Sequence, residues 1–241
     1  ILYRLPHGGN IASLAFSHDG NTLAVGTWNE IKFWNVGDGT EIHSISRQLE
    51  WVHSIAFSND DRFLVTGNEN SSVILWDLEN HSVFATLAAH SSSIFSTCFS
   101  KDNLALVSAG NDYTIKLWDI SAMKRPDTLI GHKEKVMAVS FSPDGKSIAS
   151  ASWDNNAVIW DSASRHQRHL LSQPGGDVES VHFAPDGALV ATCSYDEVTL
   201  WNSRTGLLEA TLSGHTGWVR CVRFSPDSKR LASCDDDGKL R

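Results

Sequence analysis

A histidine, a serine and an aspartate recur together in this chain, and side chains of these three types can carry out hydrolysis. Two such sets, 42 residues apart, stand at His90, Ser108 and Asp112 and at His132, Ser150 and Asp154. In a hydrolase the histidine takes the serine proton and the aspartate orients the histidine, but the reaction also needs an exposed nucleophile and an oxyanion hole. A set that returns at a fixed interval, each time with a tryptophan, is instead typical of a scaffold. We therefore predict no catalytic residues.

Other patterns that could do chemistry are incomplete. The segment DGKS at 144–147 resembles the end of a phosphate-binding loop, but the glycine required five places before Gly145 is Ser140. The 11 histidines show no H-x-x-x-H spacing and no Cys/His cluster. Four cysteines form no C-x-x-C pair and lie in strand-like runs, which indicates buried free thiols, at Cys98, Cys193, Cys221 and Cys234. We expect neither a cofactor nor a metal.

The composition is that of a globular protein from a reducing compartment. Apolar residues make up 41% and charged residues 20% of the 241 positions, and the formal net charge is −8. No basic run or stripe is present, so we do not expect binding to nucleic acid through phosphate neutralisation. No stretch approaches 18 consecutive apolar residues and the first residues lack a secretory pattern, so we expect no membrane contact. These features favour a cytoplasmic location and leave the nucleus open.

The elements that position these residues form an internal repeat of 41 or 42 residues. One phenylalanine marks it at Phe16, Phe57, Phe99, Phe141, Phe183 and Phe224. A tryptophan follows in five units, at Trp34, Trp76, Trp118, Trp160 and Trp201. The chain is therefore expected to be one domain of six units, at about 6–47, 48–89, 90–131, 132–173, 174–214 and a truncated 215–241. Repeats of this length indicate a solenoid or a propeller.

Each unit is predicted to contain four short strands. A turn follows each marker phenylalanine, and its third residue is aspartate in all six units, as in SHDG, SPDG and APDG. Aspartate and glycine favour hairpin turns, because aspartate bonds to nearby backbone and glycine tolerates positive φ. Many of the apolar runs between turns do not alternate with polar residues, which indicates sheets buried on both faces. Stacked or radially arranged sheets satisfy that pattern.

The units resemble the WD-repeat family, most fully in GHKEKVMAVSFSPDGKSIASASWDNNAVIWD at 131–161. The resemblance covers essentially the whole chain and implies an all-β propeller, or a large part of one, with four-stranded blades around a central channel. The first residues, ILYRL, resemble a fourth strand, which in this family commonly closes the ring by pairing with the last blade. The chain ends in DDDGKLR, two residues before the expected sixth tryptophan. A closed six-bladed ring and a longer ring, of which this chain is a part, both fit.

The resemblance also assigns the His, Ser and Asp sets a role. In the family, a histidine, a hydroxyl, an aspartate and a tryptophan form a hydrogen-bonded tetrad within a blade. The sets with Trp118 and Trp160 are complete, and the sixth unit offers His215, Ser233 and Asp237 without its tryptophan. The other units are eroded and carry His7, Val25, Asn29 and Trp34; Gln48, Thr66, Asn70 and Trp76; and Pro174, Thr192, Asp196 and Trp201. We predict that the third and fourth blades are the most rigid.

Four tryptophans remain outside the tetrads, at Trp28, Trp51, Trp153 and Trp218. The resemblance places all four at one end of the blades, around the channel mouth. Neighbouring positions at this mouth hold Tyr195, Phe95, Met137, His53 and Arg220. The same rim carries Lys135 and the acids Glu50, Glu69, Asp177, Glu179 and Asp236. Large aromatic side chains dominate protein-binding surfaces, and the acids suggest a protein or peptide partner that carries lysine or arginine.

The first function that the resemblance implies is a non-catalytic scaffold that binds other proteins. The alternative is a sensor or autoinhibitory domain of a larger signalling ATPase of the NACHT or NB-ARC type, which a P-loop domain upstream of Ile1 would indicate. A propeller enzyme is the third class, and it would need carboxylates or metal ligands that converge on the channel. The sequence leaves the partner, the oligomeric state and the number of blades undetermined.

Overall fold

The computed structural model describes residues 3–173 and 175–241, and for residues 47–49 it describes only the backbone. The described residues form 21 β-strands and no helix, so none of them belongs to a helix that could cross a bilayer. The strands are grouped into antiparallel meanders that follow the predicted repeat. The predicted all-β class with four-stranded blades is confirmed.

The first two blades share one seven-stranded sheet because a single long strand serves both. Its strands are β1 (Ser13–Phe16), β2 (Thr22–Gly26), β3 (Trp28–Asn35), β4 (Glu41–Phe57), β5 (Phe63–Asn68), β6 (Ser72–Asp77) and β7 (Ser82–Ala88). The first part of β4 pairs with β3, and its last six residues, from Val52 to Phe57, pair with β5. One strand is thus the outermost strand of the first blade and the innermost strand of the second.

The next three blades are separate four-stranded sheets, and the sixth is shorter. The third blade contains β8 (Ile94–Phe99), β9 (Ala105–Gly110), β10 (Ile115–Asp119) and β11 (Asp127–Leu129). The fourth contains β12 (Val136–Phe141), β13 (Ser147–Ser152), β14 (Asn156–Asp161) and β15 (Gln167–Ser172). The fifth contains β16 (Val178–Phe183), β17 (Leu189–Ser194), β18 (Glu197–Asn202) and β19 (Leu208–Ser213), and the sixth contains β20 (Val219–Phe224) and β21 (Leu231–Asp235).

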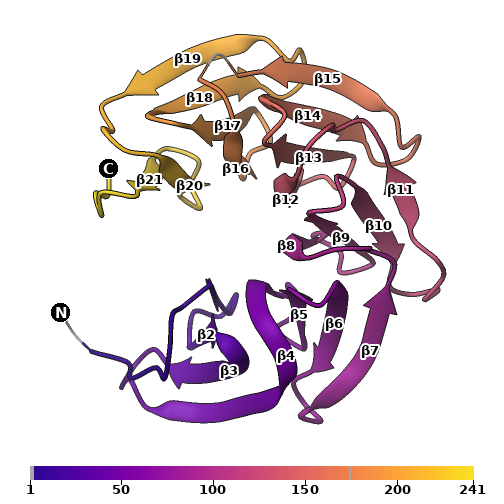
Figure 1. Cartoon of the computed structure of the whole chain (residues 1–241), viewed down its shortest axis with the longest axis vertical. Coiled ribbons are helices and arrows are strands. Elements are labelled where there is room, and N and C mark those ends of the chain that lie inside the picture. Colours follow the sequence, from indigo (N-terminus) through magenta and orange to yellow (C-terminus); the bar gives the residue numbers. More distant parts are fainter. Residues whose placement is uncertain (1–2, 174) are drawn as a thin grey trace.

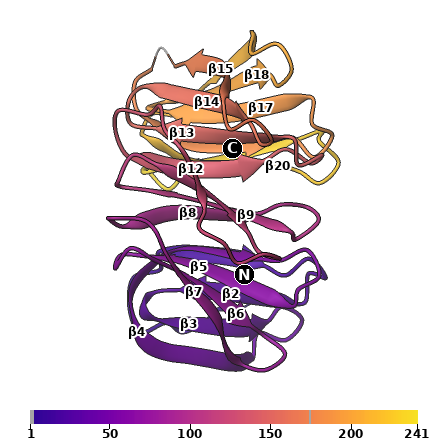
Figure 2. The ribbon, with the colours of Figure 1, turned by 90° about the vertical axis from the view of Figure 1, so that its right-hand side faces the viewer.

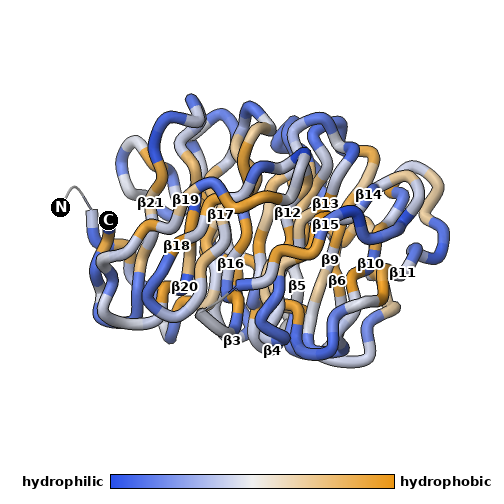
Figure 3. The backbone as a smooth tube through the Cα atoms, turned by 90° about the horizontal axis from the view of Figure 1, so that it is seen from above, coloured by the Kyte–Doolittle hydropathy of each residue, from blue (hydrophilic) through white to orange (hydrophobic). Residues whose placement is uncertain are grey.

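The blades follow one another in an open arc around a central channel (Figure 1). The innermost strands β8, β12, β16 and β20 lie nearest the channel, and Figure 2 shows the blades stacked from one end of the arc to the other. Apolar residues occupy the strands while polar residues gather in the loops above and below them (Figure 3). Strand β13 is buried along its whole length, as expected for a sheet covered on both faces.

The marker tryptophans fill the contacts between blades. Four of the five pack into a cluster with the preceding blade: Trp76 with Phe33, Trp118 with Leu75, Trp160 with Leu117 and Trp201 with Ile159. An aromatic ring of this size buries roughly 150–250 Å², which corresponds to roughly 4–6 kcal/mol of transfer free energy. The repeat is therefore held together mainly by apolar packing between neighbouring sheets.

The predicted hairpin turns are present, and they also link the blades. In the first turn the Ser17 hydroxyl donates to Asp19 at 2.6 Å. The turn residue after the aspartate has positive φ, as in Gly20 (73°), Asp61 (56°) and Asn103 (60°). Where this residue has a side chain, it bonds to the preceding turn: the Asp61 carboxylate accepts the His18 N–H at 2.7 Å.

Side-chain oxygens connect the innermost strands of neighbouring blades at all five contacts. The bonds run from Ser13 Oγ to Val52 O (2.7 Å), Thr97 N to Ser54 Oγ (2.9 Å), Val139 N to Ser96 Oγ (3.1 Å), Phe183 N to Ser140 Oγ (3.3 Å) and Val222 N to Ser180 Oγ (3.4 Å). An innermost strand has a free edge, and its backbone N–H groups need partners. The hydroxyl of the preceding blade supplies that partner in four of these contacts.

The expectation that ILYRL forms a strand on the last blade is wrong for the residues that the structure describes. Tyr3 to Leu5 form no strand, and Ile1 and Leu2 lie outside the described residues. The Tyr3 hydroxyl instead donates to Gly37 O at 2.6 Å, in the first blade. The edge of β21 is already bridged by Leu240, which pairs with Cys234. The tyrosine therefore anchors the segment to its own blade.

Candidate interaction surface

Each innermost strand from the second to the sixth blade contains a bulge near its start. The register shifts at Val52/Ser54, Ile94/Ser96, Val136/Ala138, Val178/Ser180 and Val219/Cys221. A bulge leaves one residue unpaired and redirects its side chain. The residues at these positions are His53, Phe95, Met137, Glu179 and Arg220. All five were predicted at the rim from the sequence, and the repeat explains why each blade presents one such side chain at the same end.

Trp28 and Trp51 form one part of this surface. They face each other across the pair of strands β3 and β4, and their rings meet edge to face with centroids 5.5 Å apart. Trp28 is 56% exposed, whereas Trp51 is half-buried. A fixed, partly exposed aromatic pair offers apolar area at a low entropic cost.

A second part is a connected cluster across the fourth, fifth and sixth blades. The Trp153 indole N–H donates to Glu179 Oε1 at 3.2 Å, and Arg220 donates to the same oxygen at 2.9 Å. The Arg220 guanidinium also lies 4.8 Å from the centroid of Trp218. Trp218 in turn meets the ring of Tyr195 at 6.2 Å. Five of the predicted rim residues thus form one contact chain, in which the Glu179 carboxylate bonds to Trp153 and Arg220, and Arg220 continues the chain to Trp218 and Tyr195.

The charges within this cluster are fixed by mutual contacts. Glu179 is only 8% exposed, and burial raises the pKa of its carboxyl although the neighbouring Arg220 opposes that shift. Arg220 makes two further bonds to Asp236, at 2.6 and 2.7 Å, which raise the pKa of the guanidinium. The Lys135 ammonium lies 4.6 Å from the centroid of Trp153. Cations therefore already cover one face of Trp153 and of Trp218, while Tyr195 remains 56% exposed.

The remaining predicted residues form a smaller group. His53 and Phe95 meet with ring centroids 5.4 Å apart, and His53 is bonded to Glu69. Met137 is half-buried at the bulge of β12. The structure therefore brings the predicted residues together in contact groups rather than in one continuous patch, with the cluster around Glu179 as the largest.

The two complete tetrads are confirmed and have the geometry of a buried hydrogen-bond chain. In the fourth blade, Trp160 Nε1 donates to Ser150 Oγ at 2.8 Å, and Ser150 Oγ lies 2.7 Å from His132 Nε2. His132 Nδ1 lies 2.9 Å from the Asp154 carboxylate. The third blade repeats this arrangement, with distances of 2.9, 2.8 and 2.9 Å, through Trp118, Ser108, His90 and Asp112. Both serines are fully buried, which fits a structural role.

The acid predicted for the sixth blade is wrong. His215 Nε2 lies 2.7 Å from Ser233 Oγ as expected, but His215 Nδ1 lies 2.7 Å from Asp235 rather than bonding Asp237. Strand β21 ends at Asp235, and the chain turns there, because Lys239 N–H donates to the Asp235 carboxylate at 2.9 Å. Asp237 instead accepts the Thr216 hydroxyl at 2.8 Å.

The eroded blades compensate to different degrees. In the first blade Val25 provides no hydroxyl, and the buried Trp34 Nε1 and His7 Nδ1 have no hydrogen-bond partner among the residues that the structure describes. In the second blade Trp76 Nε1 still reaches Thr66 Oγ1 at 3.3 Å, and Asn70 accepts the Ser72 hydroxyl at 2.5 Å; the Gln48 side chain lies outside the described residues.

The fifth blade contains a residue that the sequence analysis missed. Thr192 accepts the Trp201 indole at 2.8 Å and donates to Gln173 Oε1 at 2.9 Å, while Gln173 Nε2 donates to Thr199 Oγ1 at 2.6 Å. Gln173 thus occupies the histidine's place, beside Pro174, which lies outside the described residues. Asp196 is exposed. The signal in the sequence was a polar, amide-bearing residue one position before the expected histidine.

Comparison with known proteins identifies the family. The model of the WD domain, G-beta repeat, matches six segments, at residues 1–35, 39–77, 82–119, 123–161, 165–202 and 206–241. The chain therefore belongs to the WD-repeat family, as the tetrads and the four-stranded blades indicate.

Individual relatives match over shorter stretches. The chain is 34% identical over 99 residues to the general transcriptional corepressor tupA of Dictyostelium discoideum, a match that covers 39% of this chain and 17% of that protein. It is 28% identical over 89 residues to autophagy-related protein 16 of Arabidopsis thaliana, which covers 36% and 18%. It is 27% identical over 90 residues to nuclear distribution protein nudF of Aspergillus niger, which covers 36% and 20%. The matched region thus spans a fifth or less of these relatives.

Proposed function

We propose that this chain is a non-catalytic scaffold that binds a protein or peptide partner at the rim formed by the bulge residues and the extra tryptophans. The observation that carries the proposal is the cluster in which the buried Glu179 bonds to Trp153 and Arg220, while Arg220 also contacts the Trp218–Tyr195 pair. Such a cluster presents rigid aromatic surface from three blades at once. Rigid aromatic and arginine side chains are the residues that dominate binding free energy at interfaces.

The partner that suits this rim carries lysine or arginine. The described rim contains several carboxylates, and Glu69 and Asp236 are partly exposed. The exposed rings of Trp28 and Tyr195 offer π faces to a cation. Lys135 over Trp153 and Arg220 over Trp218 are intramolecular examples of the same contact. A cationic side chain of the partner would therefore find both aromatic faces and opposite charge.

The test is a binding measurement with a double variant of the rim. An immobilised array of lysine- and arginine-containing peptides, with charge-reversed copies of each, would be probed with the parent chain. We expect selective binding to the cationic set and its loss in Trp51→Ala/Trp218→Ala, with a thermal melt that shows a folded protein. Leu207→Ala is the matched control, because Leu207 is an apolar residue outside the rim and is 67% exposed. Undiminished binding by the double variant would refute the proposed surface.

A further inference from the structure

A large cavity of the described structure lies in the channel, at the end opposite to the rim. It has a volume of about 740 Å³ and is lined by the later residues of the innermost strands and by the turns that follow them. None of the five bulge residues lines it. In the second to sixth blades the lining starts one to three residues after the bulge, and it continues into turns such as those at His18, Asn59 and Lys101. The cavity is therefore a surface separate from the proposed interaction rim.

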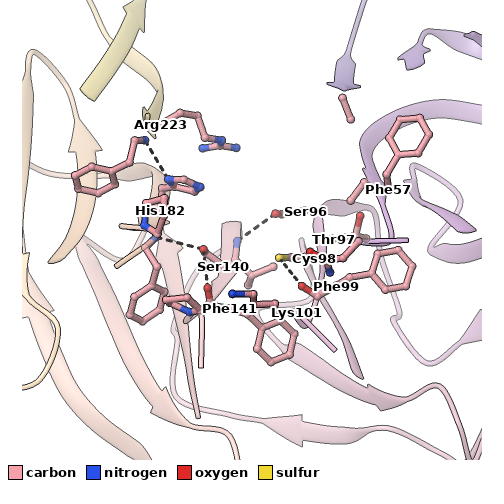
Figure 4. A pocket seen from close by; sticks show the side chains of 18 of the residues that line it. Phe57, Ser96, Thr97, Cys98, Phe99, Lys101, Ser140, Phe141, His182 and Arg223 are labelled. Carbon is pink, nitrogen blue, oxygen red and sulfur yellow. Dashed lines mark hydrogen bonds between the residues drawn. The ribbon is translucent and has the colours of Figure 1, made fainter. Parts of the chain in front are cut away.

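The lining of this cavity is positively charged in an acidic chain. It contains Lys101 and Arg223 and two histidines, His18 and His182, but none of the described lining residues is aspartate or glutamate. The chain as a whole carries a net charge of −8. Figure 4 shows Lys101, His182 and Arg223 around the same space, with Ser140 and Thr97 among the other residues that line it. A cavity with low-dielectric walls and one sign of charge concentrates ions of the opposite sign.

Arg223 has no carboxylate partner among the described residues. Its guanidinium donates to Val222 O at 2.7 Å and to Ser180 Oγ at 3.1 Å, and both acceptors are neutral. The Lys101 side chain is exposed, and no ion pair of it occurs in the described part of the chain. Arg220, at the opposite end of β20, is neutralised by two carboxylates. The positive charges of Lys101 and Arg223 are thus not neutralised by a carboxylate of the described residues, and a bound anion could compensate them.

His182 adds a neutral donor whose orientation is fixed. The Phe224 N–H donates to His182 Nδ1 at 3.1 Å, so the proton of the neutral ring resides on Nε2. The ring stacks on Phe224 with centroids 6.1 Å apart, which holds it in place. Burial, together with Arg223, lowers the pKa of His182 to about 4, so the ring is neutral near pH 7. His18 differs, because it lies beside the Asp61 carboxylate, which compensates its charge when protonated.

The backbone around the cavity argues against a peptide as its ligand. An extended peptide gains affinity by bonding to the free edge of a strand. Here the N–H groups of Thr97, Val139, Phe183, Val222 and Phe224 already bond to side chains of the preceding blade. What remains for a ligand are side-chain donors, namely an ammonium, a guanidinium, an imidazole N–H and hydroxyls. Such a donor set suits oxygens that carry charge.

We propose that this channel cavity binds a compact anion with several phosphate groups, held by Lys101 and Arg223 and by the Nε2–H of His182. The cavity walls include the buried rings of Phe57, Phe99 and Phe141. Charge-assisted bonds beside such low-dielectric groups are stronger than the same bonds in water. The proposal does not depend on the rim, because the two sets of residues do not overlap.

Inorganic tripolyphosphate is the probe for isothermal titration calorimetry at 0.15 M salt. We expect one site per chain and an affinity at least tenfold weaker in Lys101→Gln/Arg223→Gln, since each bond to a charged group contributes on the order of tenfold. Lys229→Gln/Arg230→Gln is the matched control, because it removes the same charge from exposed positions outside the cavity. A single His182→Phe substitution removes the imidazole donor but keeps an aromatic ring stacked against Phe224. This variant should also bind tripolyphosphate more weakly.

Three outcomes would overturn this proposal. One is no tripolyphosphate binding by the folded parent. Another is an equal loss in the cavity and control double variants, which would indicate diffuse charge rather than a site. The third is that an acidic peptide of equal charge binds more tightly than tripolyphosphate and depends on Arg223 in the same way. The ligand of the cavity would then be a peptide and not a compact anion. Trp51→Ala/Trp218→Ala should bind tripolyphosphate like the parent, so failure of the rim proposal and failure of this one are distinguishable.

Discussion

Removal of the Ser150 hydroxyl should destabilise the protein more than any other loss of one oxygen in the fourth blade. Ser150 is fully buried and stands in the middle of the tetrad, bonded to Trp160 Nε1 at 2.8 Å and to His132 Nε2 at 2.7 Å. In Ser150→Ala the indole N–H loses its acceptor and the imidazole nitrogen loses its donor. No water can replace them at a site where Trp160 is 2% and His132 is 8% exposed.

The size of the effect follows from these two unpaired groups. A buried polar group without a partner costs about 1–3 kcal/mol, so the two together should cost about 2–6 kcal/mol. For a chain of this length, that corresponds to a fall in Tm of roughly 4–24 °C. The cavity left by one oxygen adds little to the total. The cost is therefore electrostatic in origin rather than a loss of packing.

Thermal and urea unfolding, followed by tryptophan fluorescence and circular dichroism, would measure this change. The control is Ser172→Ala, which removes a hydroxyl from an exposed position in the same blade and should change the stability by less than about 0.5 kcal/mol. If Ser150→Ala melted within 2 °C of the parent, the tetrad would not carry the stability assigned to it, and the account of the blades as hydrogen-bonded units would be wrong.

Three further predictions concern the tetrad positions of the first, third and fourth blades. Val25→Thr should stabilise the first blade by about 0.5–1 kcal/mol in urea unfolding, because it offers an acceptor to the unpaired Trp34 Nε1; an unchanged midpoint would contradict this. Trp118→Ala should cost about 3–5 kcal/mol through the cavity and the lost bond, and a melt equal to the parent's would refute its place in the third tetrad. Burial raises the pKa of Asp154, but bonds from His132 and from the Lys133 N–H outweigh this and lower it to about 2. The stability from this depressed pKa is present above about pH 3.8 and is lost as the pH falls through 2, so urea midpoints should fall less steeply in Asp154→Asn than in the parent over that range.

Local sequence patterns predicted the parts of the fold that repeat. The interval between marker phenylalanines predicted the length of each blade. The aspartate turns predicted the hairpins that connect β1 to β2 and the equivalent strands of the other blades. The tetrads of the third and fourth blades were also predictable, because the spacing of their residues matches the strands that carry them. The rim residues were predictable as positions within the repeat, since a bulge recurs at the same point of each innermost strand.

Details that depend on turn length or on replacement by another side chain were not predictable. Counting four residues from Ser233 gave Asp237, but the tighter turn after β21 brings Asp235 to His215. Gln173 was overlooked because it precedes the expected histidine position by one residue, and only the folded blade shows that its amide reaches Thr192. Spacing along the chain does not reveal such substitutions, since a long side chain can reach a position that another residue would normally occupy.

The sequence by itself determined the class of this protein, because six units in one register can bury their apolar faces only by packing sheet against sheet. Which residues meet across the blades was decided by the tertiary structure. Trp153, Glu179 and Arg220 belong to three different units, and no local pattern joins them. The positive channel cavity likewise forms only when residues such as Lys101 and Arg223, which are far apart in the sequence, line the same space. Local spacing sets the blade, whereas the angle between blades sets the surfaces that a partner or a ligand would meet.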